Sequence, residues 1–444
     1  MDKQDLEIRG ILSQKVQTLI DEVSAKVIER DELVKLLILS IFARSHVFLI
    51  GKPGTGKTYI INIILKAVAD AKYFDYLVMH QTKPEEIFGT MITDAEGNLV
   101  YNYKNSVLDS HFVMLDEMFK GQSSILNALL GITSNDRTFT MRGKGTFKVP
   151  LITLFGASNE FPTDDALEPF DDRLLIRYDV ERIKEPENYK RLIAGDYDHS
   201  KEIKTKVSLK DLEMCDIFSK EFVRIPDNIV DIYSTIKQKI IQDRIQISDR
   251  KLVTTMHNIL KSAAYLNQRD YVNYSDLLLL KNIAWRDYTD KRKIKEILFN
   301  TIFGTKKTFE NKLVKIDEDL NNLSNFYNHE VKDFVNRLVP MTASNFELIY
   351  SQRMQKVDEF IKVLQVLDSN LSMVENKMSF NKILEKEIQE NIFLLDFKGN
   401  VFVPEIIVEM EKSRHSINQY KYVMEAFIDG ATDAYEYYNS TGNS

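Results

Sequence analysis

The chain has 444 residues, of which 44% are hydrophobic and 28% are charged, with nine prolines and 16 glycines. This length allows two to four domains with sizeable cores, and the composition excludes a disordered chain and favours long helices. The formal net charge of −7 argues against a broad nucleic-acid-binding surface, which needs clustered Lys and Arg, although it leaves room for a local basic groove.

The single cysteine and the lengths of the apolar runs indicate the cellular compartment. Cys215 has no second cysteine to pair with, which excludes an intrachain disulfide and a thiolate zinc site. The longest apolar stretch, residues 33–43, contains Lys35 and is shorter than the roughly 20 residues that a membrane-spanning helix needs. The polar N-terminus does not resemble a signal peptide. We therefore expect a cytoplasmic protein without membrane insertion.

Residues 46–50 form an apolar run that predicts a buried strand, and a complete phosphate-loop pattern follows it. The loop consists of Gly51, Lys52, Pro53, Gly54, Thr55, Gly56, Lys57 and Thr58. Its glycines let the backbone N–H groups point at a polyphosphate, and the helix that begins near Lys57 adds its positive dipole end. We expect Lys57 on the β and γ phosphates and the Thr58 hydroxyl on Mg²⁺. The pattern therefore predicts a nucleoside triphosphate, ATP, and Mg²⁺ as cofactors.

Residues 111–117 supply the acids that a triphosphate hydrolase needs, because Asp116 and Glu117 end an apolar strand-like run. Asp116 is the predicted metal ligand and Glu117 the predicted base, since consecutive strand residues point in different directions. An isolated Asp-Glu pair more often lies in a solvated turn. Its position behind the phosphate loop favours the catalytic interpretation.

Two further apolar runs, residues 73–79 and 150–155, predict additional strands, and Asn159 follows the second run. Strands that alternate with helical stretches predict an α/β fold with a parallel sheet, whose ligands lie at the carboxyl ends of the strands. Asn159 at this edge would orient the attacking water. Taken alone, it would be interpreted as a turn residue.

Several segments in order resemble the MoxR branch of AAA+ ATPases, and the RavA-like subgroup most closely. They are residues 51–58, 83–89, 115–130, 156–160, 167–177, 247–251 and 277–285, so the likeness covers about residues 8–300. The resemblance implies an AAA+ P-loop fold with helices on both faces of the sheet, followed by an α-helical lid. We expect three domains: an α/β nucleotide-binding subdomain (1–185), a helical lid (186–300) and a mainly helical C-terminal region with a small β-hairpin (301–444).

The resemblance also implies a role for each site residue. Lys57 and Thr58 would be the Walker A pair, Asp116 and Glu117 the Walker B pair, Asn159 sensor 1, Arg173 the arginine finger and Arg250 sensor 2. The finger would act on the nucleotide of a neighbouring subunit, and sensor 2 would reach the γ phosphate of its own subunit. Arg177 and Lys251 remain alternatives for these two roles.

Two predicted hairpins lie before the strand that carries Asn159. Residues 91–103 have Gly97 and Asn98 at their turn, and residues 137–148 form the second hairpin. They resemble the helix-2 insert and the pre-sensor hairpin of this clade, which face the ring pore or a partner. The alternative is that both hairpins merely extend the central sheet.

Residues after Pro186 have helical periodicity at 230–241 and 252–265, as expected for the lid. Residues 28–30 occupy the place where related proteins contact the base. In the tail, apolar residues recur at alternating steps of three and four in 357–378, and a matching seam lies in 313–327. Because Pro340 lies between them, we favour an antiparallel helical hairpin over a coiled coil between chains. Residues 393–403 predict a small hairpin and 405–428 a closing helix, with either an adaptor-binding or a structural role.

The sequence is compatible with three functions. The resemblance implies a homo-hexamer that hydrolyses ATP to remodel or activate a protein client, in a chaperone-like way, together with a von Willebrand factor A (vWA) domain protein. A nucleic-acid motor or loader is the alternative, supported by Arg137, Arg142, Lys144 and Lys148 but opposed by the acidic balance. The third is a nucleotide-gated scaffold without turnover, which Glu117, Asn159 and Arg173 oppose.

Overall fold

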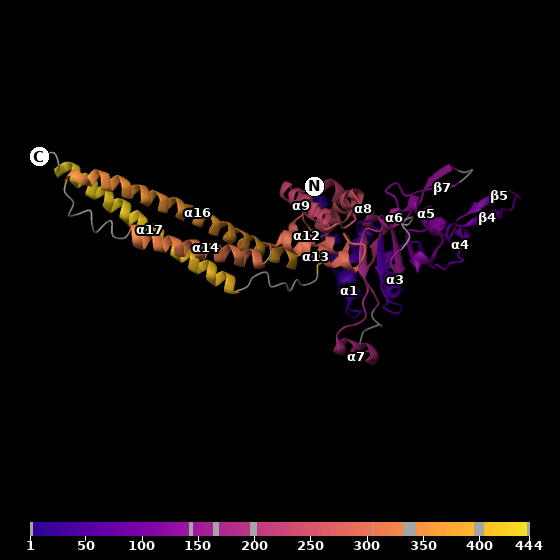
Figure 1. Ribbon diagram of the computed structural model, residues 1–444. Helices are drawn as coiled ribbons and strands as arrows, with labels where there is room; N and C mark the ends of the chain where they lie inside the picture. Colours follow the sequence, from indigo (N-terminus) through magenta and orange to yellow (C-terminus); the bar gives the residue numbers. More distant parts are fainter. Residues whose placement is uncertain are drawn as a thin grey trace. The chain divides into compact units, whose positions relative to one another are not determined.

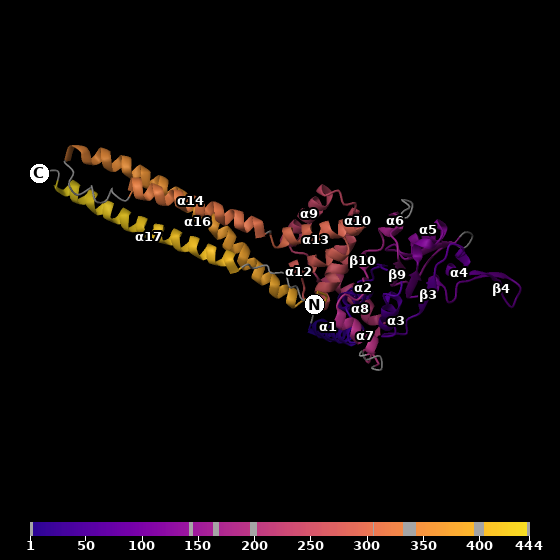
Figure 2. The ribbon, with the colours of Figure 1, turned by 60° about the horizontal axis from the view of Figure 1, so that its bottom comes forward.

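The computed structural model describes residues 3–141, 145–162, 168–195, 202–304, 306–331, 343–394 and 404–441. The chain divides into two compact units (Figures 1 and 2). The first comprises Met1–Ile302 with Lys386–Phe397, and the second Phe303–Glu385 with Lys398–Ser444. Among the described helices, none has the length and apolar character needed to cross a membrane.

A five-stranded parallel sheet forms the centre of the first unit, in the order β10-β1-β9-β6-β3. Its strands are β1 (Val47–Ile50), β3 (Tyr73–Leu77), β6 (Phe112–Asp116), β9 (Thr153–Ser158) and β10 (Ile176–Asp179). Strands β1 and β9 are buried along their whole length, which is typical of parallel strands covered on both faces. The predicted parallel α/β fold is confirmed.

The register brings the carboxyl ends of the strands to one edge. Ile50 lies opposite both Ser158 and Asp179, and Leu77 lies opposite Asp116. One strand begins later than predicted: β9 starts at Thr153 instead of residue 150, and it extends through the small residues 156–158. Pro150 has no N–H to donate to a central strand, which explains the late start.

Helices of the α/β part surround this sheet. They are α1 (Lys3–Ser24), α2 (Asp31–Phe42), α3 (Lys57–Leu65), α4 (Pro84–Phe88), α5 (Ser123–Ile132) and α6 (Glu168–Asp171), with 3₁₀ turns η1 (Val107–Asp109) and η2 (Met118–Lys120). Nine residues of α2 are buried, because its apolar sequence packs against α1, α3 and α8 (Leu209–Phe222). Helix α3 begins at the end of the phosphate loop and therefore directs its N-terminus to the carboxyl edge.

The two predicted hairpins are confirmed. Strands β4 (Thr90–Thr93) and β5 (Leu99–Asn102) pair antiparallel, as do β7 (Thr138–Met141) and β8 (Gly145–Lys148), whose turn lies outside the described residues. Each pair forms its own sheet, so the alternative that they extend the central sheet is wrong. Phe139 lies 5.4 Å from Phe88 and 5.9 Å from Phe147, ring centre to ring centre. Tyr103, just after β5, stacks on Phe147 of β8 at 5.7 Å between ring centres. This contact links the two hairpins, which lie at one end of the unit (Figure 1).

The lid follows α7 (Pro186–Ala194) and is helical, as predicted. It contains α8, α9 (Asp227–Gln242), α10 (Asp249–Thr254), α11 (Lys261–Leu266), α12 (Tyr274–Leu277), the 3₁₀ turn η5 (Leu278–Asn282) and α13 (Tyr288–Ile302). A short ladder of β11 (Val207–Ser208) with β2 (Val68–Ala69) joins it to the α/β part. The helix predicted at 252–265 is interrupted by a π-helical turn, η4 (Thr255–Leu260). Periodicity alone does not distinguish a π-turn from a continuous α-helix.

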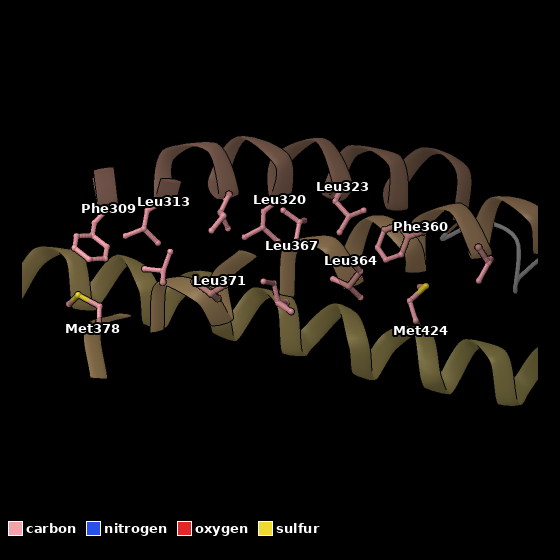
Figure 3. Close-up of a cluster of buried hydrophobic side chains, with 14 residues drawn as sticks. Phe309, Leu313, Leu320, Leu323, Phe360, Leu364, Leu367, Leu371, Met378 and Met424 are labelled. Atoms are coloured by element: carbon pink, nitrogen blue, oxygen red, sulfur yellow. The ribbon is translucent and has the colours of Figure 1, made fainter. Parts of the chain in front are cut away.

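The second unit is a bundle of long helices: α14 (Lys306–Phe326) with the π-turn η6 (Tyr327–Val331), α16 (Ala343–Gln389) and α17 (Pro404–Thr441). The two predicted seams bury each other, and they run antiparallel. Phe309 lies with Met378 at one end of the cluster and Leu323 with Phe360 towards the other (Figure 3). Ile417 and Met424 of α17 complete this core, so a third helix joins the predicted hairpin.

The end of the chain agrees with the sequence-based expectation in part. Helix α17 confirms the closing helix predicted at 405–428 but continues to Thr441. Most of the small hairpin predicted at 393–403 lies outside the described residues. Asn391, just after α16, is 3% exposed and donates hydrogen bonds to Ser275 and Asp276 of the lid within the first unit.

Candidate functional site

The phosphate loop curls as its glycines allow. Gly54 and Gly56 have φ values of 78° and 84°, a region that favours glycine, and a Cβ at Gly51 would lie 2.5 Å from the carbonyl oxygen of Val180. Lys57 is the first residue of α3 and is 8% exposed. Its Nζ donates to the carbonyl oxygens of Gly51 at 2.6 Å and Lys52 at 3.2 Å, which holds the ammonium over the loop.

The predicted acids stand beside this loop. Asp116 ends β6, and the Thr58 hydroxyl donates to its Oδ2 at 3.4 Å. Burial lowers the pKa of Lys57, whereas the charges of Asp116 and Glu117 act in the opposite direction. The structure therefore brings Lys57, Thr58 and both acids together at the carboxyl edge of the sheet.

Glu117 has a backbone conformation that the sequence did not indicate. Its φ is 52°, in the left-handed region that is costly for a residue with a Cβ. Its carboxylate lies 3.3 Å from the Nζ of Lys120, and its side chain is 17% exposed. The N–H of Glu117 donates to Asp116 Oδ1 at 2.9 Å. This backbone turn ends the strand after Asp116, so the two carboxylates do not follow simple strand alternation.

Asn159 follows β9 and is exposed at the same edge. The preceding residue, Ser158, accepts a hydrogen bond from the Gly51 N–H at 3.1 Å. The backbone just before Asn159 therefore lies beside the start of the phosphate loop.

The donor set at this edge fits Mg²⁺. Thr58 and Asp116 offer a hydroxyl and a carboxylate oxygen, and Mg²⁺ prefers one or two protein carboxylates with the remaining ligands from water and phosphate. Within the described residues, no group of three or more His, Cys, Asp or Glu side chains could hold a metal on its own. A nucleotide-bound metal suits this chain better than an all-protein metal cage.

A cavity of about 880 Å³ adjoins the phosphate loop. Residues 53–56 of the loop line it, together with Ile28 and Arg30. Tyr189 and Leu192 of α7 also line it, and the sequence had not singled them out. Glu29 does not line this cavity. Its carboxylate accepts hydrogen bonds from the N–H groups of Lys184 and Glu185 and from Asn188, so it caps the start of α7.

Arg173 and Arg177 differ sharply in their surroundings. Arg177 is 1% exposed, forms an ion pair with Asp171 and lies over the Phe48 ring at 5.6 Å. Arg173 is only partly buried and donates to the carbonyl oxygen of Pro169. Burial and the nearby Arg250 charge lower the pKa of Arg173. Both arginines precede or begin β10, at the amino edge of the sheet.

Arg250 lies at this amino edge as well. Its Nε and Nη2 donate to Asp172 Oδ2 at 3.1 and 2.7 Å. Lys251 is 4% exposed and donates to the carbonyl oxygen of Leu174 at 3.0 Å. Its guanidinium is thus paired with Asp172, close to Arg173, and its reach to the γ phosphate of its own subunit stays a prediction.

Comparison with known proteins agrees with this geometry. Residues 14–217 match the model of the MoxR domain in the MoxR-vWA-beta-propeller ternary systems, and residues 227–298 match an AAA lid domain. An uncharacterized protein of Methanocaldococcus jannaschii is 32% identical over 389 residues, which cover 83% of this chain and 99% of the relative. The chain belongs to the MoxR family of AAA+ ATPases.

Two further proteins resemble this MoxR-family chain at lower identity. Chaperone MoxR1 of Mycobacterium tuberculosis is 24% identical over 176 residues, which cover 38% of this chain and 46% of the relative. The crystal structure of a candidate ATPase from Cytophaga hutchinsonii superposes with a TM-score of 0.53 at 20% identity, covering 67% of this chain and 96% of that one. This likeness shows the AAA+ fold alone.

The electrostatic support for a nucleic-acid interface is weaker than the sequence suggested. The Arg137 guanidinium is turned inward, where it donates to the carbonyl oxygens of Arg44 at 2.7 Å and Ile152 at 3.3 Å and contacts His46. Arg142 and Lys144 lie outside the described residues. Of the four cations predicted to form a basic hairpin, Lys148 is the one that the described residues leave exposed.

Proposed function

We propose that this MoxR-family protein hydrolyses ATP, with Mg²⁺, to remodel or activate a protein partner. The observation that carries the proposal is the meeting of Lys57, Thr58, Asp116 and Glu117 at the carboxyl edge of one sheet, next to a cavity large enough for a nucleotide. A scaffold that binds ATP without turnover would not need an acid held in the costly backbone conformation of Glu117.

Each residue has a role in this proposal. Lys57 neutralises the β and γ phosphates, and the Thr58 and Asp116 oxygens hold Mg²⁺, which would offset the phosphate charge when bound. Glu117 accepts the proton of the attacking water. Asn159 orients that water from the end of β9. The base of ATP would occupy the cavity between Ile28 and Tyr189.

Arg173 acts on a neighbouring subunit in this proposal. It precedes β10, whereas Lys57 follows the other end of the adjacent strand β1, so the four-residue strand, about 13 Å long at 3.3 Å per residue, separates the two edges. Arg177 is buried in an ion pair of its own, which supports Arg173 as the arginine finger. Arg250 joins it on the face offered to the neighbour. A homo-hexameric ring would place this face against the next nucleotide.

The proposed subgroup, subdomain bounds and compartment rest on the resemblance to the family. We propose a RavA-like member with subdomains 1–185, 186–300 and 301–444 that acts in the cytoplasm. The matched family model is named for MoxR-vWA-beta-propeller systems, and one relative is named a chaperone, which supports a vWA-domain partner and a chaperone-like activity. The two hairpins would face the pore or the partner.

The decisive experiment compares Glu117→Gln with Lys57→Ala. Glu117→Gln should retain its affinity for ATP, but its turnover rate should fall roughly 100-fold or more, which is the contribution of a general base. Lys57→Ala should lose nucleotide binding. Asp109→Asn is a matched control, because this acid lies before the opposite end of β6 and pairs with Lys72. Parental turnover in Glu117→Gln would show that the base is assigned wrongly.

The nucleic-acid alternative is tested in the same assay. ATP turnover is measured with single-stranded DNA, RNA or an unfolded protein, and the Glu117→Gln variant serves as bait for partners in a lysate. Stimulation by nucleic acid alone, without response to protein, would replace the proposed function by that of a nucleic-acid motor.

A further inference from the structure

The segment that carries Arg173 is held largely by side chains of the lid. Asp172, the residue before Arg173, accepts hydrogen bonds from the Ser248 hydroxyl at 2.7 Å and from Arg250 Nη2 at 2.7 Å. Leu174, the residue after it, accepts from the Lys251 ammonium at 3.0 Å. Arg173 is therefore flanked on both sides by contacts to one short stretch of the lid at the start of α10.

A second lid stretch, around Arg286, touches the same segment. The Arg286 guanidinium pairs with Glu168 at the start of α6, and its carbonyl oxygen accepts a hydrogen bond from Arg177 at 3.3 Å. We call Glu168, Asp172, Ser248, Arg250, Lys251 and Arg286 the lid clamp. These residues come from distant parts of the sequence, with Arg250 standing 78 residues after Asp172.

The same stretch of the lid also contacts the nucleotide side. Lys281 pairs with Glu32 at 2.7 Å, and Asn282 donates to the same carboxylate at 3.0 Å. Glu32 lies two residues after Arg30, which lines the cavity next to the phosphate loop. Lys291 pairs with Asp179 at the carboxyl end of β10 at 2.9 Å. Within about ten residues, the lid thus connects the surroundings of its own nucleotide cavity with the segment of Arg173.

We propose that the lid clamp positions the arginine finger: the lid of one subunit, set by its own nucleotide, orients the Arg173 that this subunit lends to its neighbour. The proposal rests on the proposed function, because it requires Arg173 to act as a finger. Asp172 is then a positioning residue, which acts on turnover only through Arg173. The lid would carry the coupling, because it makes polar contacts with Glu32 near the cavity and with Asp172 beside Arg173.

Asp172→Ala tests the clamp. Turnover should fall about 10- to 100-fold, the loss expected from misplacing a reacting group by about 1 Å, with ATP affinity unchanged because the phosphate loop is intact. Asp249→Ala is the matched control. Asp249 stands next to Arg250, but its carboxylate pairs with Lys237 and is 75% exposed, so its loss should leave turnover unchanged.

A double-mutant cycle with Arg173→Ala separates positioning from a general structural effect. If Asp172 acts only through Arg173, the double variant Asp172→Ala/Arg173→Ala should turn over no more slowly than Arg173→Ala alone. Losses that multiply would overturn the clamp, and so would parental turnover in Asp172→Ala. Parental turnover in Arg173→Ala, or a parent that stays monomeric with ATP, would instead overturn the proposed finger and the clamp with it.

Discussion

Replacing Arg177 by Ala should destabilise the first unit strongly, because this arginine is structural. Its ion pair with Asp171 is buried, with 1% and 6% of the two side chains exposed. Removing one partner of a buried pair leaves an uncompensated charge and costs about 3–5 kcal/mol. The contact of the guanidinium with the Phe48 ring is lost as well. At about 2–4 °C per kcal/mol, the midpoint of thermal unfolding should fall by roughly 6–20 °C.

Arg173→Ala is the matched comparison, four residues earlier in the same segment. Arg173 is partly buried and donates to a backbone carbonyl, so its removal should change the unfolding midpoint by no more than about 2–4 °C, the equivalent of about 1 kcal/mol. Its turnover should nevertheless fall by about 10³-fold or more, the contribution of an arginine finger.

Differential scanning fluorimetry and an ATP turnover assay on both variants check this contrast. The double variant Asp171→Asn/Arg177→Met should recover at least half of the stability lost by Arg177→Ala, since it removes both buried charges. An Arg177→Ala protein that keeps the parental midpoint but loses turnover would refute the reasoning and would make Arg177 the finger.

Three further outcomes follow from individual side chains. Tyr189→Ala should weaken ATP binding roughly 3- to 10-fold in a fluorescent-nucleotide titration, because this ring lines the cavity. Ile193 lies on the same helix with 71% of its surface exposed, so Ile193→Ala should leave ATP binding unchanged. Equal effects of the two substitutions would exclude the Tyr189 ring as a contact of the base. Burial lowers the pKa of Lys251 to about 7, so this group favours the folded state increasingly as pH rises from about 7 towards 10. The unfolding free energy of Lys251→Met relative to the parent should therefore decline between pH 7.5 and 9, by up to about 1.4 kcal/mol per pH unit. Urea unfolding of both proteins at each pH measures it, and a pH-independent difference would contradict the burial argument. Leu371 is buried in the tail core, so Leu371→Ala should lower the free energy of urea unfolding by about 2–5 kcal/mol. Met373 is 60% exposed, and Met373→Ala should change this free energy by no more than about 0.5 kcal/mol. Similar losses for both variants would mean that the seam is assigned to the wrong face of the helix.

The nucleotide site was the most predictable part of the chain, because its chemistry demands particular residue types at fixed positions. Gly51 to Thr58 must form a loop before a helix, and Asp116 must end a neighbouring strand. Hydrophobic runs locate these strands, and parallel pairing then brings their carboxyl ends to one edge. The structure places Lys57, Thr58 and Asp116 there, as the sequence predicted.

Contacts between distant segments could not be predicted in the same way. A motif around Arg250 indicates a role at a nucleotide, but it does not say which subunit's nucleotide lies within reach. That depends on the pairing of Arg250 with Asp172, which is a property of how the lid packs. Arg137 is a similar case. A cation in a hairpin sequence is expected to be exposed and able to bind phosphate, but the Arg137 guanidinium is bound by backbone carbonyl oxygens.

In the tail, the sequence predicted that helices pack together but not how many of them do so. Heptad spacing predicts that Leu364 and Leu371 need a partner helix, and the structure supplies the predicted one. The spacing does not give the number of partners, because one stripe can serve two neighbours. Helix α17 adds Met424 to the same core, and its Arg414 pairs with Asp368 and Glu375 of α16. These ion pairs fix the register of the third helix, which the apolar pattern leaves open.

The surroundings of Arg173 include one ion pair buried in the core and one partly exposed ion pair with the lid. Two residues before it, Asp171 is tied to Arg177 inside the core, a pair that is costly to break. Directly before it, Asp172 is tied to Arg250, with 14% and 40% of the two side chains exposed, and this partly exposed pair is less costly to break than the buried one. A lid that shifts can therefore exchange the second contact at lower cost while the first stays in place. Arg173 would turn about a fixed neighbour, which is the motion that a finger controlled by a lid requires.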